Sequence, residues 1–200
     1  MPLDLPVMLA LAQACAPSVA PATLLPVAHV ESGFDPLAIG VNGPGPSHIH
    51  PSSTVQAVEM ATRLIARGIN VDLGLTQINV RNLTPLGLSI SAAFDPCRNL
   101  AASAHLIKAG YEHAGPLPGA EQAALRTSLS LYNTGDTRRG FRNGYVARVT
   151  AAARRIIPAL QPDGAETPAP PPAAAPTWDV FARAGAGDRF VFTSIERDRP

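Results

Sequence analysis

The sequence predicts a mainly α-helical fold with a small β-hairpin region, and three observations support this prediction. Apolar residues recur at helical spacing over most of the chain up to about residue 160. Capping residues and prolines mark the beginning of several of these segments, and glycines mark their ends. Alternation of apolar and polar residues is confined to one short stretch, Ile69 to Leu73. We therefore expect a helical bundle with a minor sheet.

The composition indicates a globular domain followed by an extended end. The 200 residues are 46% hydrophobic and 16% charged, and the formal net charge is +1. This charge gives no support for nucleic acid or an anionic membrane as a general partner, and no apolar run is long enough to span a bilayer. Because many of the 21 prolines lie late in the chain, we predict a domain over 1–160, a Pro/Ala-rich linker over 161–176 and a tail over 177–200.

The first apolar segment, Leu3 to Ala14, is predicted to be a structural helix capped by Asp4. A secretory signal is the alternative, because Leu5 to Ala12 is apolar and small residues follow it. Asp4 precedes this run, and no Lys or Arg does. We therefore favour the structural helix.

The second helix is predicted to begin at Pro21 and to end near Gly33, which places Glu31 in its last turn on the inward-facing stripe. Pro26 either kinks this helix or begins it, and both alternatives leave Glu31 in the last turn. Apolar neighbours and the negative end of the helix dipole should raise the pKa of Glu31. Such a group is a candidate general acid, although a lone Glu at a helix end is more often a surface residue.

A short strand is predicted over Leu37 to Val41, followed by a loop over Asn42 to Pro51 that is rich in Pro and Gly. His48 and His50 lie in this loop with no third ligand at a recognisable spacing. We therefore favour exposed histidines over a metal site.

The remaining elements follow from local signals. A capping box, Ser53 to Gln56, begins a helix that ends at Gly68, and a strand from Ile69 to Leu73 turns at Gly74. Three further helices are predicted, over Asp95 to His113, Ala120 to Tyr132 with a cap at Asn133 to Gly135, and Asn143 to Pro158.

The two cysteines, Cys15 and Cys97, each adjoin a predicted helix. They are either buried thiols or one disulfide, and their spacing does not suit a metal site. In an oxidising compartment we favour the disulfide, because closing a loop of this length contributes about 4 kcal/mol in the chain-entropy model.

Four motifs occur in a fixed order with compatible spacing: Glu31 to Pro36, Gly74 to Asn79, Leu131 to Gly135, and Gly144 to Val149. Together they resemble the motifs of the soluble lytic transglycosylases, relatives of goose-type lysozyme, over about residues 15–158. The resemblance implies a lysozyme-like α+β fold with a sugar-binding groove. Cys97 and the proline-rich tail look most like the branch encoded with type IV secretion systems, the VirB-type enzymes.

The resemblance also implies an activity on peptidoglycan, with no cofactor and no metal. The family cleaves the β-1,4 bond between N-acetylmuramic acid and N-acetylglucosamine and leaves a 1,6-anhydro end, with Glu31 as the single catalytic acid and base. It implies that Tyr132 hydrogen-bonds and orients Glu31. The residues expected to bind substrate are Ser32, Thr76, Gln77, Tyr132, Asn133 and Tyr145, and threonine at position 76 replaces a methionine that many relatives carry.

Location and partners are expectations that follow from this substrate. Peptidoglycan lies outside the inner membrane, so we expect a periplasmic protein. The tail carries Trp178, Val180 and Phe181, and it is either a peptide that docks on secretion-channel proteins or a disordered end. A hydrolytic lysozyme and a non-catalytic glycan-binding assembly factor are the alternative functions.

Overall fold

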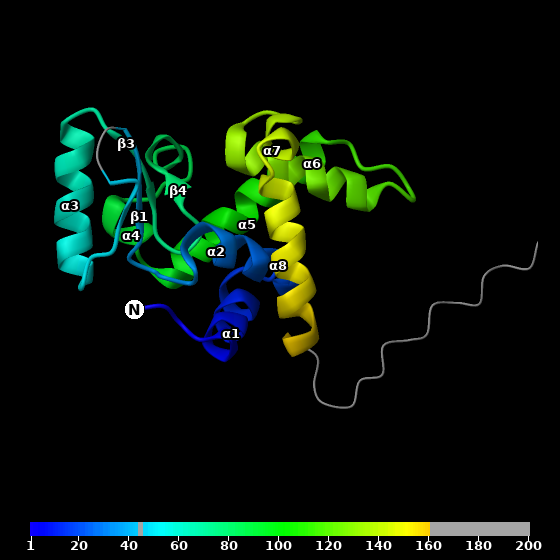
Figure 1. Cartoon of the computed structure of the whole chain (residues 1–200), viewed down its shortest axis with the longest axis horizontal. Coiled ribbons are helices and arrows are strands. Elements are labelled where there is room, and N and C mark those ends of the chain that lie inside the picture. Colours follow the sequence, from blue (N-terminus) through cyan, green and yellow to red (C-terminus); the bar gives the residue numbers. More distant parts are fainter. Residues whose placement is uncertain (44–45, 161–200) are drawn as a thin grey trace, which may run out of the picture. The chain divides into compact units, whose positions relative to one another are not determined.

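The computed structural model describes residues 1–43 and 46–160, so the predicted linker and tail lie outside the described residues. Helices dominate the described part, as predicted, and they accompany one small sheet (Figure 1). In chain order the elements are α1 (Leu5–Cys15), α2 (Pro21–Ser32), β1 (Ile39–Asn42), β2 (His48–Ile49), α3 (Thr54–Ala66), β3 (Asn70–Leu73), β4 (Ile78–Asn79), the 3-10 helix η1 (Val80–Asn82), α4 (Ile90–Ala93), α5 (Pro96–His113), α6 (Glu121–Thr134), α7 (Arg139–Arg142) and α8 (Tyr145–Leu160).

Capping residues mark the beginning or the end of several of the longer helices. The Asp4 side chain accepts a hydrogen bond from the backbone N–H of Val7 (2.9 Å) at the start of α1, and Asp95 accepts one from Arg98 (2.8 Å) at the start of α5. Helix α2 runs without a break through Pro26 and ends at Gly33, whose φ of 62° is left-handed. Glu31 therefore lies in the last turn of α2, as predicted.

The strands of the described part form one antiparallel sheet in the order β2-β1-β3-β4. Leu73 of β3 pairs with Ile39 of β1 and with Ile78 of β4. The prediction that 42–51 is only loop was wrong, because His48 and Ile49 pair with β1. A strand of two residues has no detectable side-chain period, so the sequence pattern could not reveal it.

Two hydrophobic cores lie on either side of α5. One core joins buried residues of α1, α2, α5, α6 and α8. The other joins the sheet, α3 and α4 to Ala102 and Leu106 of α5. Figure 1 shows this division, with the sheet and α3 on one side, α6 to α8 on the other, and α2 and α5 between them.

Short helices and one helix end differ from the sequence prediction. Helices α4 and α7, of four residues each, were not predicted, because one turn carries too few residues to show a helical period. Helix α8 continues through Pro158 to Leu160, two residues beyond the predicted limit. The helix therefore accommodates this proline within its last turn.

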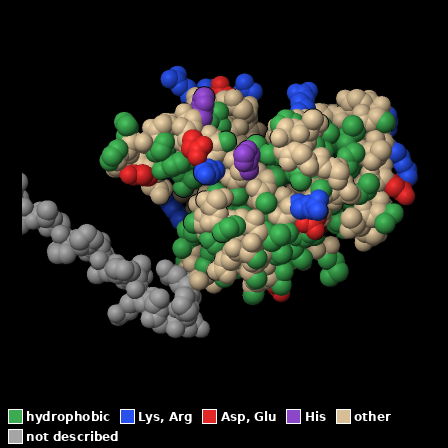
Figure 2. All heavy atoms as spheres, turned by 180° about the vertical axis from the view of Figure 1, so that it is seen from behind, with side chains coloured by type: hydrophobic (Ala, Val, Ile, Leu, Met, Phe, Trp, Pro, Cys, Tyr) green, Lys and Arg blue, Asp and Glu red, His purple; other side chains and the backbone are tan. Residues whose placement is uncertain are grey.

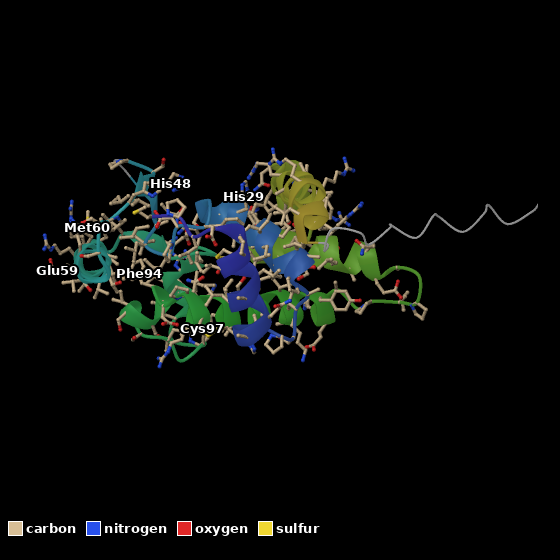
Figure 3. All side chains as sticks on the ribbon, turned by 90° about the horizontal axis from the view of Figure 1, so that it is seen from below. His29, His48, Glu59, Met60, Phe94 and Cys97 are labelled. Atoms are coloured by element: carbon tan, nitrogen blue, oxygen red, sulfur yellow. A yellow bond between two sulfur atoms is a disulfide. The ribbon has the colours of Figure 1, made fainter. Side chains whose placement is uncertain are left out.

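A disulfide joins Cys15 at the end of α1 to Cys97 in the first turn of α5, with the two Cα atoms 5.2 Å apart. Figure 3 labels Cys97 on α5, close to α1. The bond confirms the favoured interpretation of the two cysteines. It fixes the beginning of the helix that separates the two cores.

The surface seen in Figure 2 carries basic and acidic side chains that are scattered among apolar ones, without a single large charged patch. Within residues 1–43 and 46–160, no helix combines the length and the apolar character needed to cross a membrane.

Candidate active site

A groove of about 790 Å³ lies between the sheet and the helices. One wall comes from the sheet and η1, and the other from the ends of α2 and α6. Helix α5 lines the groove through Leu106, Ala109, Gly110 and His113, whose spacing places them on one helical face. Glu31 lines the groove from the end of α2.

The Glu31 carboxylate accepts a 2.6 Å hydrogen bond from the phenol of Tyr145. Desolvation raises the pKa of Glu31 from 4.5 to about 7. The hydrogen bond from Tyr145 lowers this pKa, the negative charge of Asp72 raises it, and the positive charge of Arg148 lowers it. The group can therefore hold a proton near neutral pH and release it without a large change in conditions.

The phenol that reaches Glu31 belongs to Tyr145, so the prediction that Tyr132 makes this hydrogen bond was wrong. The Tyr132 hydroxyl donates to the carbonyl oxygen of Thr76 (2.7 Å) and accepts from Ser103 Oγ (3.2 Å). Tyr145 is 1% exposed, and burial together with the charge of Glu31 raises its pKa, so it remains a protonated donor.

The packing of α8 against α2 explains why Tyr145, and not Tyr132, bonds to Glu31. Tyr145 shares the buried stripe of α8 with Val149, Ala152 and Ile156, and these residues belong to the same core as the buried residues of α2. The tyrosine at the start of that stripe therefore meets Glu31 at the end of α2. The periodicity of α8 carried this signal, and the sequence interpretation did not use it.

Asp72 lies on the sheet wall and receives two amide hydrogen bonds. Asn42 Nδ2 donates to Asp72 Oδ2 (2.6 Å), and Asn79 Nδ2 donates to Asp72 Oδ1 (2.7 Å). The three residues come from β1, β3 and β4, and all three line the groove. Amides and a carboxylate on one face provide donors and acceptors that suit the hydroxyl and acetamido groups of a sugar.

The predicted substrate-binding residues Ser32 and Gln77 hold backbone carbonyls of the protein through their side chains. Ser32 Oγ donates to the carbonyl of Leu75 (2.7 Å). Gln77 Nε2 donates to the carbonyls of Ala38 (3.1 Å) and Gly74 (2.8 Å), and Gln77 lines the groove. Gln77 has a left-handed φ of 52°, an uncommon conformation for a residue with a side chain, and these two bonds help to hold it.

Three of the residues predicted to bind substrate, Ser32, Thr76 and Tyr145, are not among those that line the groove. Thr76 is fully buried, and its hydroxyl donates to Asn99 Oδ1 (2.6 Å). Asn133 and Tyr132 do line the groove at the end of α6, and Asn133 Oδ1 accepts a hydrogen bond from Asn143 Nδ2 (2.9 Å).

No group of three His, Cys, Asp or Glu side chains that could hold a metal occurs in residues 1–43 and 46–160. His50 Nδ1 lies 2.8 Å from Asp35 Oδ2, and neither residue lines the groove. The groove thus offers acid–base and hydrogen-bonding groups.

The described residues form a helical domain with a small sheet and a groove that contains a desolvated carboxyl group. This combination is consistent with a lysozyme-like fold. Residues 8–153 match the family model described as the transglycosylase SLT domain. The chain belongs to this family and is a lytic transglycosylase, as the motif resemblance indicated.

Relatives associated with type IV secretion extend the match. The chain is 41% identical to "Protein virB1" of Agrobacterium fabrum over 173 residues, which cover 85% of this chain and 68% of the relative. It is 44% identical to "Protein virB1" of Rhizobium radiobacter over 149 residues, which cover 74% and 62%. It is 40% identical to "Type IV secretion system protein virB1" of Brucella suis over 177 residues, which cover 82% and 74%. The matches therefore span between about three fifths and three quarters of these relatives. No solved structure matches the chain at a significant level.

Proposed function

We propose that the protein cleaves the β-1,4 bond between N-acetylmuramic acid and N-acetylglucosamine in peptidoglycan and forms a 1,6-anhydro end, with Glu31 as the catalytic residue. The observation that carries this proposal is a carboxyl group with a pKa near 7 that lines a groove of about 790 Å³. One residue of this kind can act as an acid and then as a base.

In the first step, protonated Glu31 donates its proton to the glycosidic oxygen as the bond to C1 breaks. In the second step, the Glu31 carboxylate takes the proton from the C6 hydroxyl as that oxygen closes on C1. The 2.6 Å hydrogen bond from Tyr145 holds the carboxyl group in one orientation and stabilises the carboxylate between the two steps. Leu75 and Ile78, both buried, exclude water from this side of the site.

A hydrolytic, lysozyme-like reaction at the same site is the second candidate activity, and the position of Asp72 favours it. Asp72 lines the same groove and is held by two amides, so a water between the two carboxylates would have a base to orient it. The two functions differ in their products, because hydrolysis leaves reducing ends and the transglycosylase leaves anhydro ends.

The test is digestion of isolated sacculi followed by mass spectrometry of the soluble fragments. We expect 1,6-anhydro ends from the parent protein. Glu31→Gln should lower the rate by about 100- to 10,000-fold, the contribution of a general acid–base group, while the fold and the binding of glycan strands stay intact. Reducing ends would support the lysozyme instead, and an active Glu31→Gln variant would refute both mechanisms.

The relatives named for type IV secretion indicate the setting of this activity. We propose that the protein acts in the periplasm, where it opens the cell wall locally for assembly of a type IV secretion system. Secretion-channel proteins that bind the tail over 177–200 are the proposed partners. Binding of a tail peptide to purified channel components tests this part separately from the chemistry.

A further inference from the structure

The turn between β3 and β4 is held by side chains from three other parts of the chain and by one of its own. Each of four consecutive carbonyls accepts a side-chain hydrogen bond. The pairs are Asn99 Nδ2 to Leu73 O (2.9 Å), Gln77 Nε2 to Gly74 O (2.8 Å), Ser32 Oγ to Leu75 O (2.7 Å) and Tyr132 OH to Thr76 O (2.7 Å). We call residues 73–77 the clamped turn. Its backbone position is therefore determined from several directions at once.

Asn99 makes more bonds to this turn than any other side chain in that set. It is fully buried in the first turn of α5. Its Nδ2 also donates to Ala93 O (2.7 Å), and its Oδ1 accepts from both Thr76 N (2.9 Å) and Thr76 Oγ1 (2.6 Å). These four bonds use both donors and both acceptor sites of the amide.

The packing of the clamped turn also explains why position 74 is a glycine. A Cβ at Gly74 would clash with the backbone carbonyl oxygen of Ala93 and would lie 2.6 Å from Asn99 Nδ2, and Gly74 has a left-handed φ of 75°. Any other residue at this position would disturb the Asn99 amide and Ala93 O, which is one of its partners. Asn99 and Gly74 therefore form one closely packed unit.

The same turn contacts the catalytic region at two points. Ser32, which binds Leu75 O, is the residue next to Glu31. Gln77, at the end of the turn, lines the groove together with Glu31. A displacement of the turn would thus move the segment beside Glu31 and a wall of the groove together.

We propose that Asn99 is a positioning residue for the glycosidic cleavage, which it serves by holding the clamped turn against the end of α2. This proposal rests on the proposed function of Glu31. Asn99 contacts neither the groove nor Glu31, so it acts only through Thr76 and the backbone of the turn. A misplacement of about 1 Å in an active site can lower a rate by about 100-fold.

The first test is Asn99→Leu, which keeps the approximate volume and removes all four bonds. We expect kcat, per folded molecule, to fall by about 10- to 100-fold, while glycan binding changes by less than about threefold. The alkaline limb of the pH–rate profile should move to lower pH, because water that enters beside the loosened turn reduces the desolvation of Glu31. Ser128→Ala is the matched control, because Ser128 is also fully buried and bonds a backbone carbonyl, that of Ile107.

A second pair of variants keeps the proposal testable if Asn99→Leu does not fold. Thr76→Val removes only the hydroxyl that donates to Asn99, and Thr76→Ser retains it. We expect Thr76→Val to lower kcat and Thr76→Ser to restore it. Equal kcat values for these two variants would overturn the proposal in that case.

Two results with folded Asn99→Leu would also overturn it. One is an unchanged kcat with a lowered melting temperature, as in the Ser128→Ala control, because Asn99 would then serve stability alone. The other is a loss of glycan affinity with unchanged kcat and pH profile, because the turn would then serve binding. Failure of the proposed function itself is distinguishable, since it would appear as an active Glu31→Gln variant.

Discussion

The two walls of the groove each present one carboxyl group, and their surroundings differ. Glu31, on the helical wall, accepts a hydrogen bond from Tyr145 and is desolvated. Asp72, on the sheet wall, has an amide donor on each oxygen. The comparison shows how one groove places the same functional group in two different settings. Desolvation raises the pKa of Glu31, and the negative charge of Asp72 adds to this rise.

The largest expected effect is on stability. Because the pKa of Glu31 is about 7 in the folded protein and 4.5 in the reference state, the protonated group contributes stability below pH 4.5, and this contribution is lost as the pH rises to 7. At pH 8, the free energy of unfolding of Glu31→Gln should therefore exceed that of the parent by about 3 kcal/mol. At pH 4, the two free energies of unfolding should be nearly equal. Urea unfolding at both pH values measures this difference.

The control for this measurement is Glu59→Gln. Glu59 is exposed on α3 and pairs with Arg63 (2.9 Å), so its replacement should change stability by less than about 1 kcal/mol at either pH. If Glu31→Gln shows no more pH dependence than this control, Glu31 is not desolvated and the contrast between the walls fails.

A smaller effect is expected from the donor on the helical wall. Tyr145→Phe should lower kcat by about 10- to 100-fold, the equivalent of one hydrogen bond to a charged group. The alkaline limb of the pH–rate profile should move to higher pH, because the hydrogen bond from Tyr145 lowers the pKa of Glu31. Tyr132→Phe, which loses a bond to Thr76 instead, should not move the limb upward. The opposite pattern in the two variants would restore Tyr132 to the role first predicted for it.

Asp72→Asn should sharpen the comparison from the other wall. Since the charge of Asp72 raises the pKa of Glu31, the limb should move to lower pH, by less than about one unit for a partly solvated pair. The products should still carry 1,6-anhydro ends. A variant that loses all activity would instead make Asp72 part of the chemistry.

The smallest effect on glycan cleavage is expected from a deletion in the tail. Among the residues that the structure describes, those that line the groove lie between Glu31 and Gly135. Deletion of 177–200 should therefore leave the rate of glycan cleavage within about twofold, since the catalytic groups and their supports are retained. Release of soluble fragments from sacculi measures this rate, and a truncated protein that folds but does not cleave would place the tail within the catalytic unit.

Much of the fold could be predicted because local signals were strong. Asp4, Asp95 and Gly33 begin or end their helices where the capping patterns placed them. Strand β2 and helices α4 and α7 could not be predicted, because two to four residues carry no period. Such short elements form through tertiary contacts that only the folded chain provides.

The place of Glu31 at the end of α2 was predictable, and the side chains that contact it were not. Glu31 followed from its place in the last turn of α2 and from the four motifs. The partner of Glu31 depended on which tyrosine α8 or α6 turns toward α2, a question of packing between segments more than 100 residues apart. Asn99 was missed as a support because a polar residue in the first turn of a helix usually faces water, and only the tertiary structure shows its four partners.

The disulfide joins Cys15 to Cys97, which are 82 positions apart in the sequence. The loop that it closes contains Glu31 and the clamped turn. A protease that cuts once within the exposed part of 46–50 would break the polypeptide without releasing either fragment. The two pieces would migrate together on a gel until a thiol reagent is added. Proteolytic nicking of this enzyme is therefore visible only after reduction.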